Sequence, residues 1–383
     1  MKNNSADLPS SENEALRILI ATENVTAGGE GVHIRTLART LTAMGNTVYV
    51  CAGSNSQELG TGPDGDIKFV RIAPGHHLSG ILRNASEIRR LVKENRIDIV
   101  HCHGRGSAFA VHLAHLKVPY VYTCHTMSLQ TDFFHRAITK YGCEAIAVSS
   151  ACREFMEKGL GIPENKITVI PNGIDQSAFT PLSGTEKQAL RKKYRLPEGC
   201  FTAAVHGRFD VRKNHRLIAE AVKALPEEDR KKLVVLCSGW RSGPCYEEFV
   251  QTLRKYGISG NFRFTGWTSS RSILGVSDVL LAPSLVESFL MTAVEAFFMK
   301  VPVIRSVTGG YEEMKDICIG LPASDIHAWT AALHGCIVGG TGDGNMCGRA
   351  YEKACREFTA EVMAARTLKV YKKAIAENVR RKV

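Results

Sequence analysis

The chain has 383 residues, of which 44% are hydrophobic and 23% charged, and its formal net charge is +11. This is the balance of an ordinary globular protein, the length favours two domains, and the absence of any apolar stretch of about 18 residues argues against a membrane span. The positive charge favours anionic partners, namely nucleic acid, an acidic membrane surface or phosphorylated small molecules. Composition alone does not choose among these three.

The N-terminal segment, residues 1–15, lacks the apolar core of a secretory signal, so we expect a disordered leader. Twelve cysteines are scattered along the chain without a CxxC pair. In a chain without a secretory signal, this pattern indicates free thiols in a reducing compartment. We therefore expect a cytoplasmic protein.

Short segments rich in β-branched residues recur along the first half of the chain, each ended by Gly, Pro, Asn or Ser. Segments with helical period, such as 31–45 and 81–96, lie between several of them. Strands that alternate with helices predict βαβ units and a parallel sheet. We expect strands at 16–21, 46–52, 67–72, 97–103, 119–125, 144–150 and 166–172.

The pattern restarts after a polar, charged bridge at 185–199, with strands expected at 201–207, 232–239, 261–266, 278–284 and 301–306. The sequence therefore predicts an α/β protein with two Rossmann-like, doubly wound domains. We place the first domain at 16–180 and the second at 181–356. The last segment, 357–383, is helical throughout and is expected to pack back on the first domain.

Two cations follow the first strand of the second domain, in VHGRFDVRKNHRLIAEAV (205–222). Arg208 and Lys213 stand between the end of a strand and the start of a helix, a position that suits a diphosphate. A solvated turn with exposed charges is the alternative, and the residues alone leave both interpretations open.

Two glutamates, Glu287 and Glu295, stand eight positions apart in the apolar run PSLVESFLMTAVEAF (283–297). A buried carboxylate without a partner is costly, so each needs a reason to be there. With a helix expected over 288–299, Glu287 lies in the loop entering it and Glu295 two turns inside. One could bind a sugar and the other a ribose diol, or Glu287 could cap the helix while Glu295 is half exposed.

The whole set of motifs resembles the retaining GT-B glycosyltransferases of family 4. A strand followed by GRxxxxxK, and PSxxExF with a second glutamate eight residues on, are joined by AGGEGVHIRTLARTL, DIVHCHG, AVSS, VIPNGID, RFTGW and VPVIRSVTGGYEE. They occur in the family's order from about residue 16 to residue 313, and 358–374 resembles the family's closing helix. Each motif is weak alone, but the ordered series is specific.

The resemblance implies a GT-B fold whose domains face a cleft, the first binding an acceptor and the second a nucleotide sugar. Arg208 and Lys213 would hold the donor diphosphate, Glu287 would contact sugar hydroxyls, and Glu295 would contact the ribose. His125 would position the acceptor or the sugar, with His101 and His103 on the acceptor side. The other donor-side positions would be Gly28, Gly29, Gly207, Gly266, Ser288, Phe289, Leu290, Met291 and Thr292.

The chain departs from the family pattern at two positions. Leu290 stands where the family usually has a glycine, which could reshape the sugar pocket, and Lys300 stands where a glycine is common before the PVI strand. Neither change removes an ionic contact. The transferase activity therefore remains the expectation, while the donor sugar stays open.

No metal site is expected. Asp64-Gly65-Asp66 spells DxD, but its setting in GTGPDGDIK indicates a turn. His101, Cys102, His103, Cys124 and His125 cluster at two strand ends, yet their spacing matches no common zinc pattern. Positive charge from Arg208, Lys213 and a helix N-terminus would replace a divalent ion, so no cofactor is expected.

Two basic amphipathic segments leave membrane contact open. In 81–96 the apolar residues share one face, which could lie on an anionic bilayer or cover the sheet of a βαβ unit, and the C-terminal segment poses the same choice. Many acceptors of the family are lipid-linked or belong to surface glycans.

The leading hypothesis is therefore a retaining glycosyltransferase that uses a nucleotide sugar, UDP-linked or else GDP-linked, in lipopolysaccharide, capsule or exopolysaccharide synthesis. The first alternative is a nucleotide-sugar 2-epimerase, which shares the architecture but not the ordered motif series. The second is a basic nucleic-acid-binding protein, although no aromatic-and-basic recognition module is visible and we expect no nucleic-acid partner.

Overall fold

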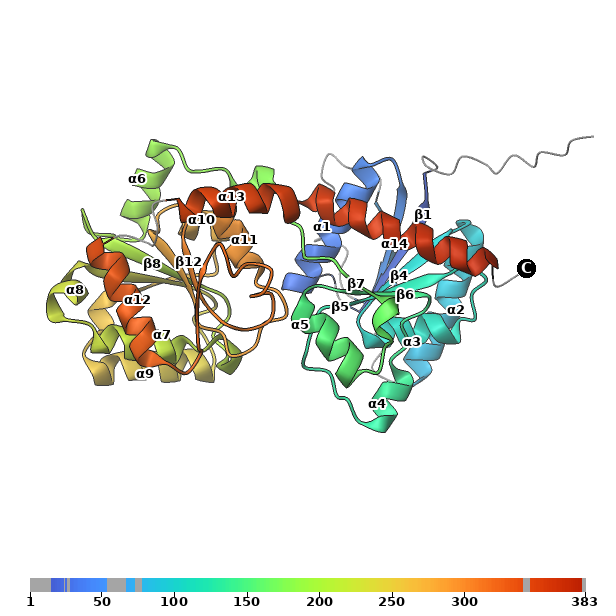
Figure 1. Cartoon of the computed structure of the whole chain (residues 1–383), viewed down its shortest axis with the longest axis horizontal. Coiled ribbons are helices and arrows are strands. Elements are labelled where there is room, and N and C mark those ends of the chain that lie inside the picture. Colours follow the sequence, from blue (N-terminus) through green and yellow to red (C-terminus); the bar gives the residue numbers. More distant parts are fainter. Residues whose placement is uncertain are drawn as a thin grey trace, which may run out of the picture. The chain divides into compact units, whose positions relative to one another are not determined.

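The computed structural model describes residues 15–23, 25, 28–53, 67–72, 78–339 and 345–380. Apart from Ala15, the expected leader lies outside the described residues, and so does the Asp64-Gly65-Asp66 turn. Strands and helices alternate along the described chain (Figure 1).

The first sheet has seven strands in the order β3-β2-β1-β4-β5-β6-β7. Its central pairs are parallel, with Ile18 of β1 aligned to Val48 of β2 on one side and to Ile99 of β4 on the other. The strands are β1 (Arg17–Thr22), β2 (Thr47–Ala52), β3 (Lys68–Arg71), β4 (Ile99–His103), β5 (Tyr120–Cys124), β6 (Glu144–Ala147) and β7 (Ile167–Val169).

The second sheet has six strands in the order β10-β9-β8-β11-β12-β13, and its pairs are also parallel. These strands are β8 (Phe201–His206), β9 (Leu233–Ser238), β10 (Phe262–Gly266), β11 (Val279–Ala282), β12 (Val303–Ser306) and β13 (Ile319–Leu321). Most residues of β8, β9, β11 and β12 are buried, as expected for parallel strands covered on both faces.

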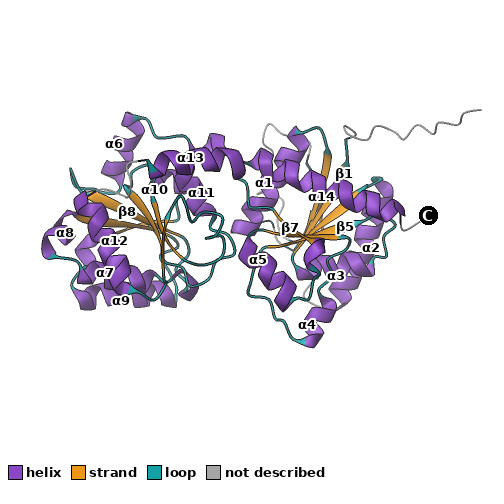
Figure 2. Cartoon of the chain, viewed as in Figure 1, coloured by secondary structure: helices purple, strands orange, loops and turns teal. Residues whose placement is uncertain are grey.

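Helices lie on both sides of the strands in each sheet (Figure 2). They are α1 (Gly29–Ala43), α2 (Leu78–Glu94), α3 (Arg105–Leu113), α4 (Phe133–Ile138), α5 (Ser150–Glu154), α6 (Gly184–Lys193), α7 (His215–Ala224), α8 (Glu227–Lys232), α9 (Pro244–Tyr256), α10 (Ser270–Leu274), α11 (Met291–Phe298), α12 (Ile326–Gly339), α13 (Met346–Glu357) and α14 (Ala360–Arg380). Single-turn helices include Phe155–Gly159, Glu164–Lys166, Gln176–Phe179, Val211–Lys213 and Ser259–Asn261. The two-domain α/β prediction is thus confirmed.

Two compact units are distinguished by their contacts. One contains Met1–Thr123, Phe133–Ala145 and Leu368–Val383, and the other contains Cys124–Asp132 and Ile146–Thr367. The C-terminal half of α14 therefore belongs with the first part of the chain. Tyr371 is fully buried, and its hydroxyl oxygen lies 2.6 Å from Nδ1 of His101. Lys373 Nζ donates a hydrogen bond to Glu144 Oε2 at 2.8 Å.

Every strand expected from the sequence is present, and the structure adds three corrections. The three-residue strand β13 was missed. The charged bridge at 185–199 is largely the helix α6, whose first turn carries a capping box between Ser183 and Glu186. The helix expected from residue 288 begins at Met291.

The two basic amphipathic segments use their apolar faces inside the protein. In α2, Ala85, Ile88 and Leu91 are buried, and in α14 Val370, Tyr371 and Ala374 are buried. Most of each apolar face is therefore covered, while Leu82 of α2 and Val379 of α14 are more than half exposed. Within the described ranges, every helix falls short of the length and apolarity that crossing a bilayer requires. All twelve cysteines are free thiols.

The hydroxyl of Tyr371 is the contact that we expect to matter most for the attachment of α14. Burial holds the pKa of His101 well below its ordinary value, with the charge of His33 as a second cause, so the ring is neutral and needs a partner for each nitrogen. Thr123 Oγ1 lies 2.6 Å from Nε2, and Tyr371 serves Nδ1. Tyr371→Phe should therefore lower the free energy of unfolding by about 1–3 kcal/mol in urea titrations.

Tyr351, partly exposed on α13, provides a matched control. Tyr351→Phe should change the free energy of unfolding by less than about 0.5 kcal/mol. Equal effects from the two substitutions would show that the His101 contact does not stabilise the attachment of α14.

Candidate functional site

Both sheets reverse their strand order at one point, between β1 and β4 in the first and between β8 and β11 in the second. Ligands of open α/β sheets bind at the carboxyl ends of the strands beside such a reversal. In the second sheet, the loops that follow β8 and β11 carry the cations and the first glutamate expected from the sequence. The fold thus brings Lys213 and Glu287, which are 74 positions apart, to one place.

The loop after β8 holds Arg208 and Lys213. Gly207 has φ = 143°, which favours glycine, so the chain turns sharply where the strand ends. Asp210 then caps the single turn Val211–Lys213, with its carboxylate accepting from the Lys213 N–H at 3.2 Å. Arg208 is exposed, and its guanidinium makes no hydrogen bond or ion pair with the described residues. It is therefore available to an anion.

Lys213 forms an ion pair with Glu287 that sequence reasoning missed. Lys213 Nζ donates to Glu287 Oε1 at 2.6 Å, and Ser284 Oγ donates to the same oxygen at 2.7 Å. The lysine side chain is 28% exposed and the glutamate side chain 14%. Glu287 is therefore neither a helix cap nor unpaired, because a cation from the neighbouring strand's loop holds it.

Further hydrogen bonds fix these two loops to each other. The Leu285 N–H donates to Arg212 O at 2.7 Å, and Asn214 Nδ2 donates to Pro283 O at 3.2 Å and to Ala323 O at 3.0 Å. Asn214 adopts φ = 51°, a left-handed conformation that asparagine tolerates better than most residues. The pairing of Lys213 and Glu287 thus rests on a preformed frame.

The segment from Ser288 to Leu290 leads into α11. Leu290 is the N-cap residue of α11, and no side chain caps this helix. The backbone N–H groups of Met291 and Thr292, in the first turn, are therefore available to a ligand near the end of β11. Leu290 has φ = −81°, which any residue adopts, so the missing glycine causes no backbone strain here. Ser149 Oγ donates to Ser288 O at 2.7 Å.

A glycine that follows β12 and an arginine within β12 support this segment. A Cβ on Gly309 would lie 2.1 Å from Glu287 O, so only glycine allows that approach. Arg305 is fully buried, and its Nη2 donates to Gly309 O at 2.7 Å. Burial lowers its pKa, an effect opposed by neighbouring groups that include Glu287. A charged residue inside the VPVIRS strand was the signal available in the sequence.

Lys300, the other departure from the family pattern, has φ = 57°. A glycine would adopt this conformation at no cost, which explains why glycine suits the position.

Glu295 lies on α11 and is partly buried. Burial raises the pKa of its carboxyl to about 7, while a hydrogen bond with Ser270 lowers it. The group therefore changes its charge near neutral pH. The structure separates the two glutamates, since a cation holds Glu287 whereas burial governs Glu295.

A small pocket beside the ion pair is lined by residues that include His206, Lys213, Ser284, Leu290 and Thr292. Burial, and then the charge of Lys213, lowers the pKa of His206 to about 4. Its Nδ1 is buried without a hydrogen-bond partner among the described residues. His206 ends β8 and was not singled out from the sequence, although a histidine before GRF was visible.

Gly266, expected on the donor side, ends β10 with φ = 74°. The exposed ring of Trp267 follows it and stacks on Trp240, which follows β9, with ring centroids 5.9 Å apart. The carboxyl ends of β8, β9 and β10 thus lie side by side, because His206 and Gly266 both align with Ser238.

In the first sheet, Gly28 precedes α1 with φ = 125° and Gly29 begins that helix. Glu30, in its first turn, has a pKa raised to about 7, mainly by burial and then by the charge of Glu23, while a hydrogen bond from Thr22 lowers it. Sequence reasoning passed over Glu30, and only its place at the end of the loop after β1 could have drawn attention to it.

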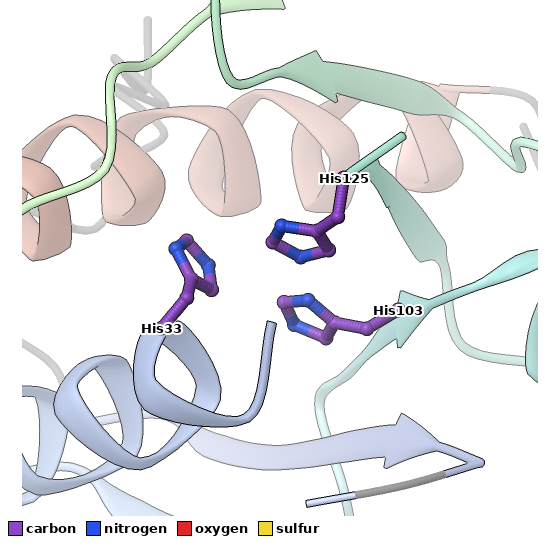
Figure 3. A group of neighbouring side chains, drawn as sticks. All are labelled: His33, His103 and His125. Atoms are coloured by element: carbon purple, nitrogen blue, oxygen red, sulfur yellow. The ribbon is translucent and has the colours of Figure 1, made fainter. Parts of the chain in front are cut away.

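Three histidines gather at the carboxyl end of the first sheet. Figure 3 shows His33 from α1, His103 from the end of β4, and His125, which directly follows β5. Each ring has a nitrogen within 4.8 Å of a nitrogen of each other ring, so these side chains could hold a metal ion. His103 and His125 were expected to be near each other, whereas His33 was missed. His101 instead points to Tyr371 and Thr123.

Comparisons with known proteins agree with this geometry. The family model described as Glycosyltransferase Family 4 matches residues 27–178, and the one described as Glycosyl transferases group 1 matches residues 186–316. D-inositol 3-phosphate glycosyltransferase of Xylanimonas cellulosilytica is 26% identical over 391 aligned positions, which cover 91% of this chain and 92% of that protein.

Solved structures have the same fold. HepE of Anabaena in complex with UDP superposes with a TM-score of 0.81 at 15% identity, covering 94% of this chain and 100% of that one. The lipopolysaccharide outer core galactosyltransferase WaaB superposes with a TM-score of 0.67 at 17% identity, covering 94% of this chain and 98% of that one.

The raised pKa of Glu295 generates a prediction about pH. If its ionised form accepts hydrogen bonds from a ribose diol, nucleotide affinity should fall as the pH falls through 7, because protonation removes an acceptor. UDP-glucose is a suitable probe, since its diphosphate does not titrate near neutrality. Calorimetry should show its dissociation constant rising about tenfold from pH 8 to pH 6.

Glu295→Gln should bind more weakly at both pH values and lose this dependence. Glu30→Gln is the matched control, because Glu30 titrates in the same range from the first sheet. If Glu295→Gln keeps the full pH dependence and Glu30→Gln abolishes it, the ribose role belongs elsewhere.

Proposed function

Since this chain belongs to the family 4 glycosyltransferases of GT-B fold, we propose that it is a retaining enzyme that moves a sugar from a nucleotide diphosphate to a hydroxyl of a glycan or glycolipid acceptor. The observation that carries the proposal is the joining of Lys213, Glu287 and the loop of Arg208 at the strand reversal of the second sheet. We interpret this arrangement as an anion site beside an acid that would bind sugar hydroxyls.

The cations would act on the leaving group. Departure of the nucleoside diphosphate builds negative charge on its phosphate oxygens while the sugar becomes oxocarbenium-like. Lys213 has three N–H donors, so it can keep Glu287 and still reach a phosphate oxygen. Arg208 can donate two parallel hydrogen bonds to the same group. Donors that are aimed at developing charge before the reaction begins lower the barrier most.

Glu287 would orient the sugar ring, and His125 would position the acceptor or the sugar without bonding to it. No protein nucleophile stands among the matched motifs. We therefore favour attack by the acceptor oxygen on the face that the diphosphate leaves, with the departing phosphate taking the acceptor's proton. The anomeric configuration is then kept.

A UDP-sugar is the favoured donor and a GDP-sugar the second choice, because HepE, with the same fold, binds UDP. Lipopolysaccharide, capsule or exopolysaccharide synthesis is the proposed setting, supported by the fold shared with WaaB. A thermal-shift panel of UDP, GDP, ADP and their sugars would select the donor, since a ligand that binds the native state raises its melting temperature.

The mechanism predicts a large loss of turnover from either cation. Arg208→Ala and Lys213→Ala should each cut kcat by about 100-fold or more, for transfer or for hydrolysis of the donor. Both variants should stay folded, with the melting temperature of Arg208→Ala near that of the wild type and that of Lys213→Ala lower, because Glu287 loses its cation. Arg216→Ala is the matched control, because Arg216 is exposed on α7 and pairs with Glu220. Its kcat should be unchanged.

NMR of the new linkage should show the donor's own anomeric configuration. An inverted product would exclude the proposed attack whatever the mutants do. An epimerised nucleotide sugar formed without acceptor would instead favour the 2-epimerase alternative.

Metal independence is a separate expectation. Because Arg208, Lys213 and the start of α11 would supply the positive charge, turnover should survive exhaustive treatment with EDTA. Loss of activity that Mg²⁺ or Mn²⁺ restores would contradict it. EDTA could instead cause a loss of turnover that only Zn²⁺ restores. If EDTA then causes no such loss in His33→Ala, the result would assign a function to the histidine cluster.

A further inference from the structure

His206, the last residue of β8, has no part in the mechanism proposed above. It stands just before the loop that carries Arg208 and Lys213, and its ring is only partly buried. The strand residues before it, Ala204 and Val205, are apolar and buried. An apolar side chain would continue this pattern without burying a polar group, so the histidine needs another explanation.

One nitrogen of this ring lacks a hydrogen bond. Nδ1 of His206 is buried and has no hydrogen-bond partner within the described part of the chain. Buried polar atoms are normally paired, and one left unpaired raises the free energy of the fold. In a native structure such an atom is explained by a bound water or ligand, or by a function of the group.

The ring lines a small pocket at the strand reversal of the second sheet. The pocket has a volume of about 10 Å³, which is room for one oxygen-sized group. Lys213 lines it from the loop after β8, Ser284 from the loop after β11, and Leu290 and Thr292 from the start of α11. An ammonium group, a helix N-terminus and an imidazole thus surround a space that fits one anionic oxygen.

The acid closest to this arrangement in the argument, Glu287, does not oppose an anion there. Lys213 and Ser284 both donate hydrogen bonds to its Oε1. None of the described residues that line the pocket is acidic. An oxygen of a ligand would therefore meet donors, while the charge of Glu287 is balanced by a cation.

The ring of His206 is neutral at pH 7. Burial, and then the charge of Lys213, lowers its pKa to about 4, so the imidazole carries a single proton. A neutral imidazole can hold that proton on Nδ1 and donate it to an oxygen without repelling the neighbouring ammonium group. A lysine or arginine in its place would add a like charge beside Lys213.

A second histidine of the pocket, His215, is less accessible. Its Nε2 is also buried without a hydrogen bond to the described residues, but its ring is only 6% exposed and stacks on Phe209, with centroids 4.4 Å apart. The ring of His206 instead lies beside that of the exposed Trp267, with centroids 5.7 Å apart. Of the two histidines, His206 is therefore the one that a ligand can reach.

We propose that His206 is a further donor-binding residue, whose Nδ1–H donates a hydrogen bond to an oxygen of the diphosphate that Arg208 and Lys213 would hold. This contact rests on the function proposed above and adds a residue to the same site. The oxygen would fill the small pocket and supply the partner that Nδ1 lacks. Because the oxygen is anionic, the hydrogen bond should be stronger than one between two neutral groups.

Ligand titrations of the full chain, followed by NMR, test this contact. UDP is the first probe, or GDP if the chain binds it more tightly, and the matching nucleoside is the second because it lacks phosphate. His206→Leu should weaken binding of the diphosphate about tenfold or more and change binding of the nucleoside less than about twofold. His206→Asn, whose amide N–H lies close to the position of Nδ1, should keep most of the affinity, whereas His206→Gln, whose amide lies further out, should not.

His327→Leu is the matched control, because His327 is exposed on α12 of the same unit. It should bind both ligands as the wild type does, and melting temperatures should show that all variants are folded.

Equal binding of the diphosphate by His206→Leu and the wild type would overturn the proposal. Equal losses for the diphosphate and the nucleoside would also overturn it, because they would place the ring against the base or the ribose. Rescue by His206→Gln without rescue by His206→Asn would exclude Nδ1. A wild type that binds nucleoside diphosphates no better than nucleosides would contradict the proposed donor site itself, and with it this contact.

Discussion

The ion pair between Lys213 and Glu287 is the contact on which the arrangement of the site depends. Replacing a half-buried pair by apolar residues is often neutral or stabilising, so stability alone does not explain it. Its value is positional. The ammonium group and the carboxylate come from loops on two adjacent strands, and each fixes the other where the sheet order reverses. Hydrogen bonds from Ser284, Asn214 and the Leu285 N–H then hold the two loops, and with them the ion pair, in place.

The supporting shell explains residues that have no expected contact with a ligand. Gly309 must lack a side chain for the loop of Glu287 to come close, and Arg305 holds Gly309 from a fully buried position. A buried guanidinium is tolerable here because backbone and hydroxyl oxygens of the same turn accept its hydrogen bonds. The VPVIRSVTGG stretch is thus a support for PSLVESF.

Sequence reasoning located the strands because buried parallel strands are short apolar runs with clear stops. It missed β13, whose three residues are only half buried. It also missed α6, which buries no residue, so that its capping box was the only sequence signal for a helix there. At the site, spacing predicted which side chains end a strand. It could not pair Lys213 with Glu287 or bring His33 to His103, because such contacts depend on loop conformation and not on periodicity.

The two glutamates of PSLVESFLMTAVEAF illustrate how environment separates identical side chains. Glu287 lies against a cation, so a ligand phosphate that approaches Lys213 also changes the neighbourhood of the acid that would hold the sugar. Glu295 lies among buried neighbours, and burial raises its pKa to about 7, so its charge follows the pH. In the proposed mechanism, diphosphate and sugar binding would therefore be coupled through one ion pair, whereas burial would tune the ribose contact separately. Substrates that share the ribose but differ in the base would make the same contact with Glu295, so the base would have to be distinguished by other residues.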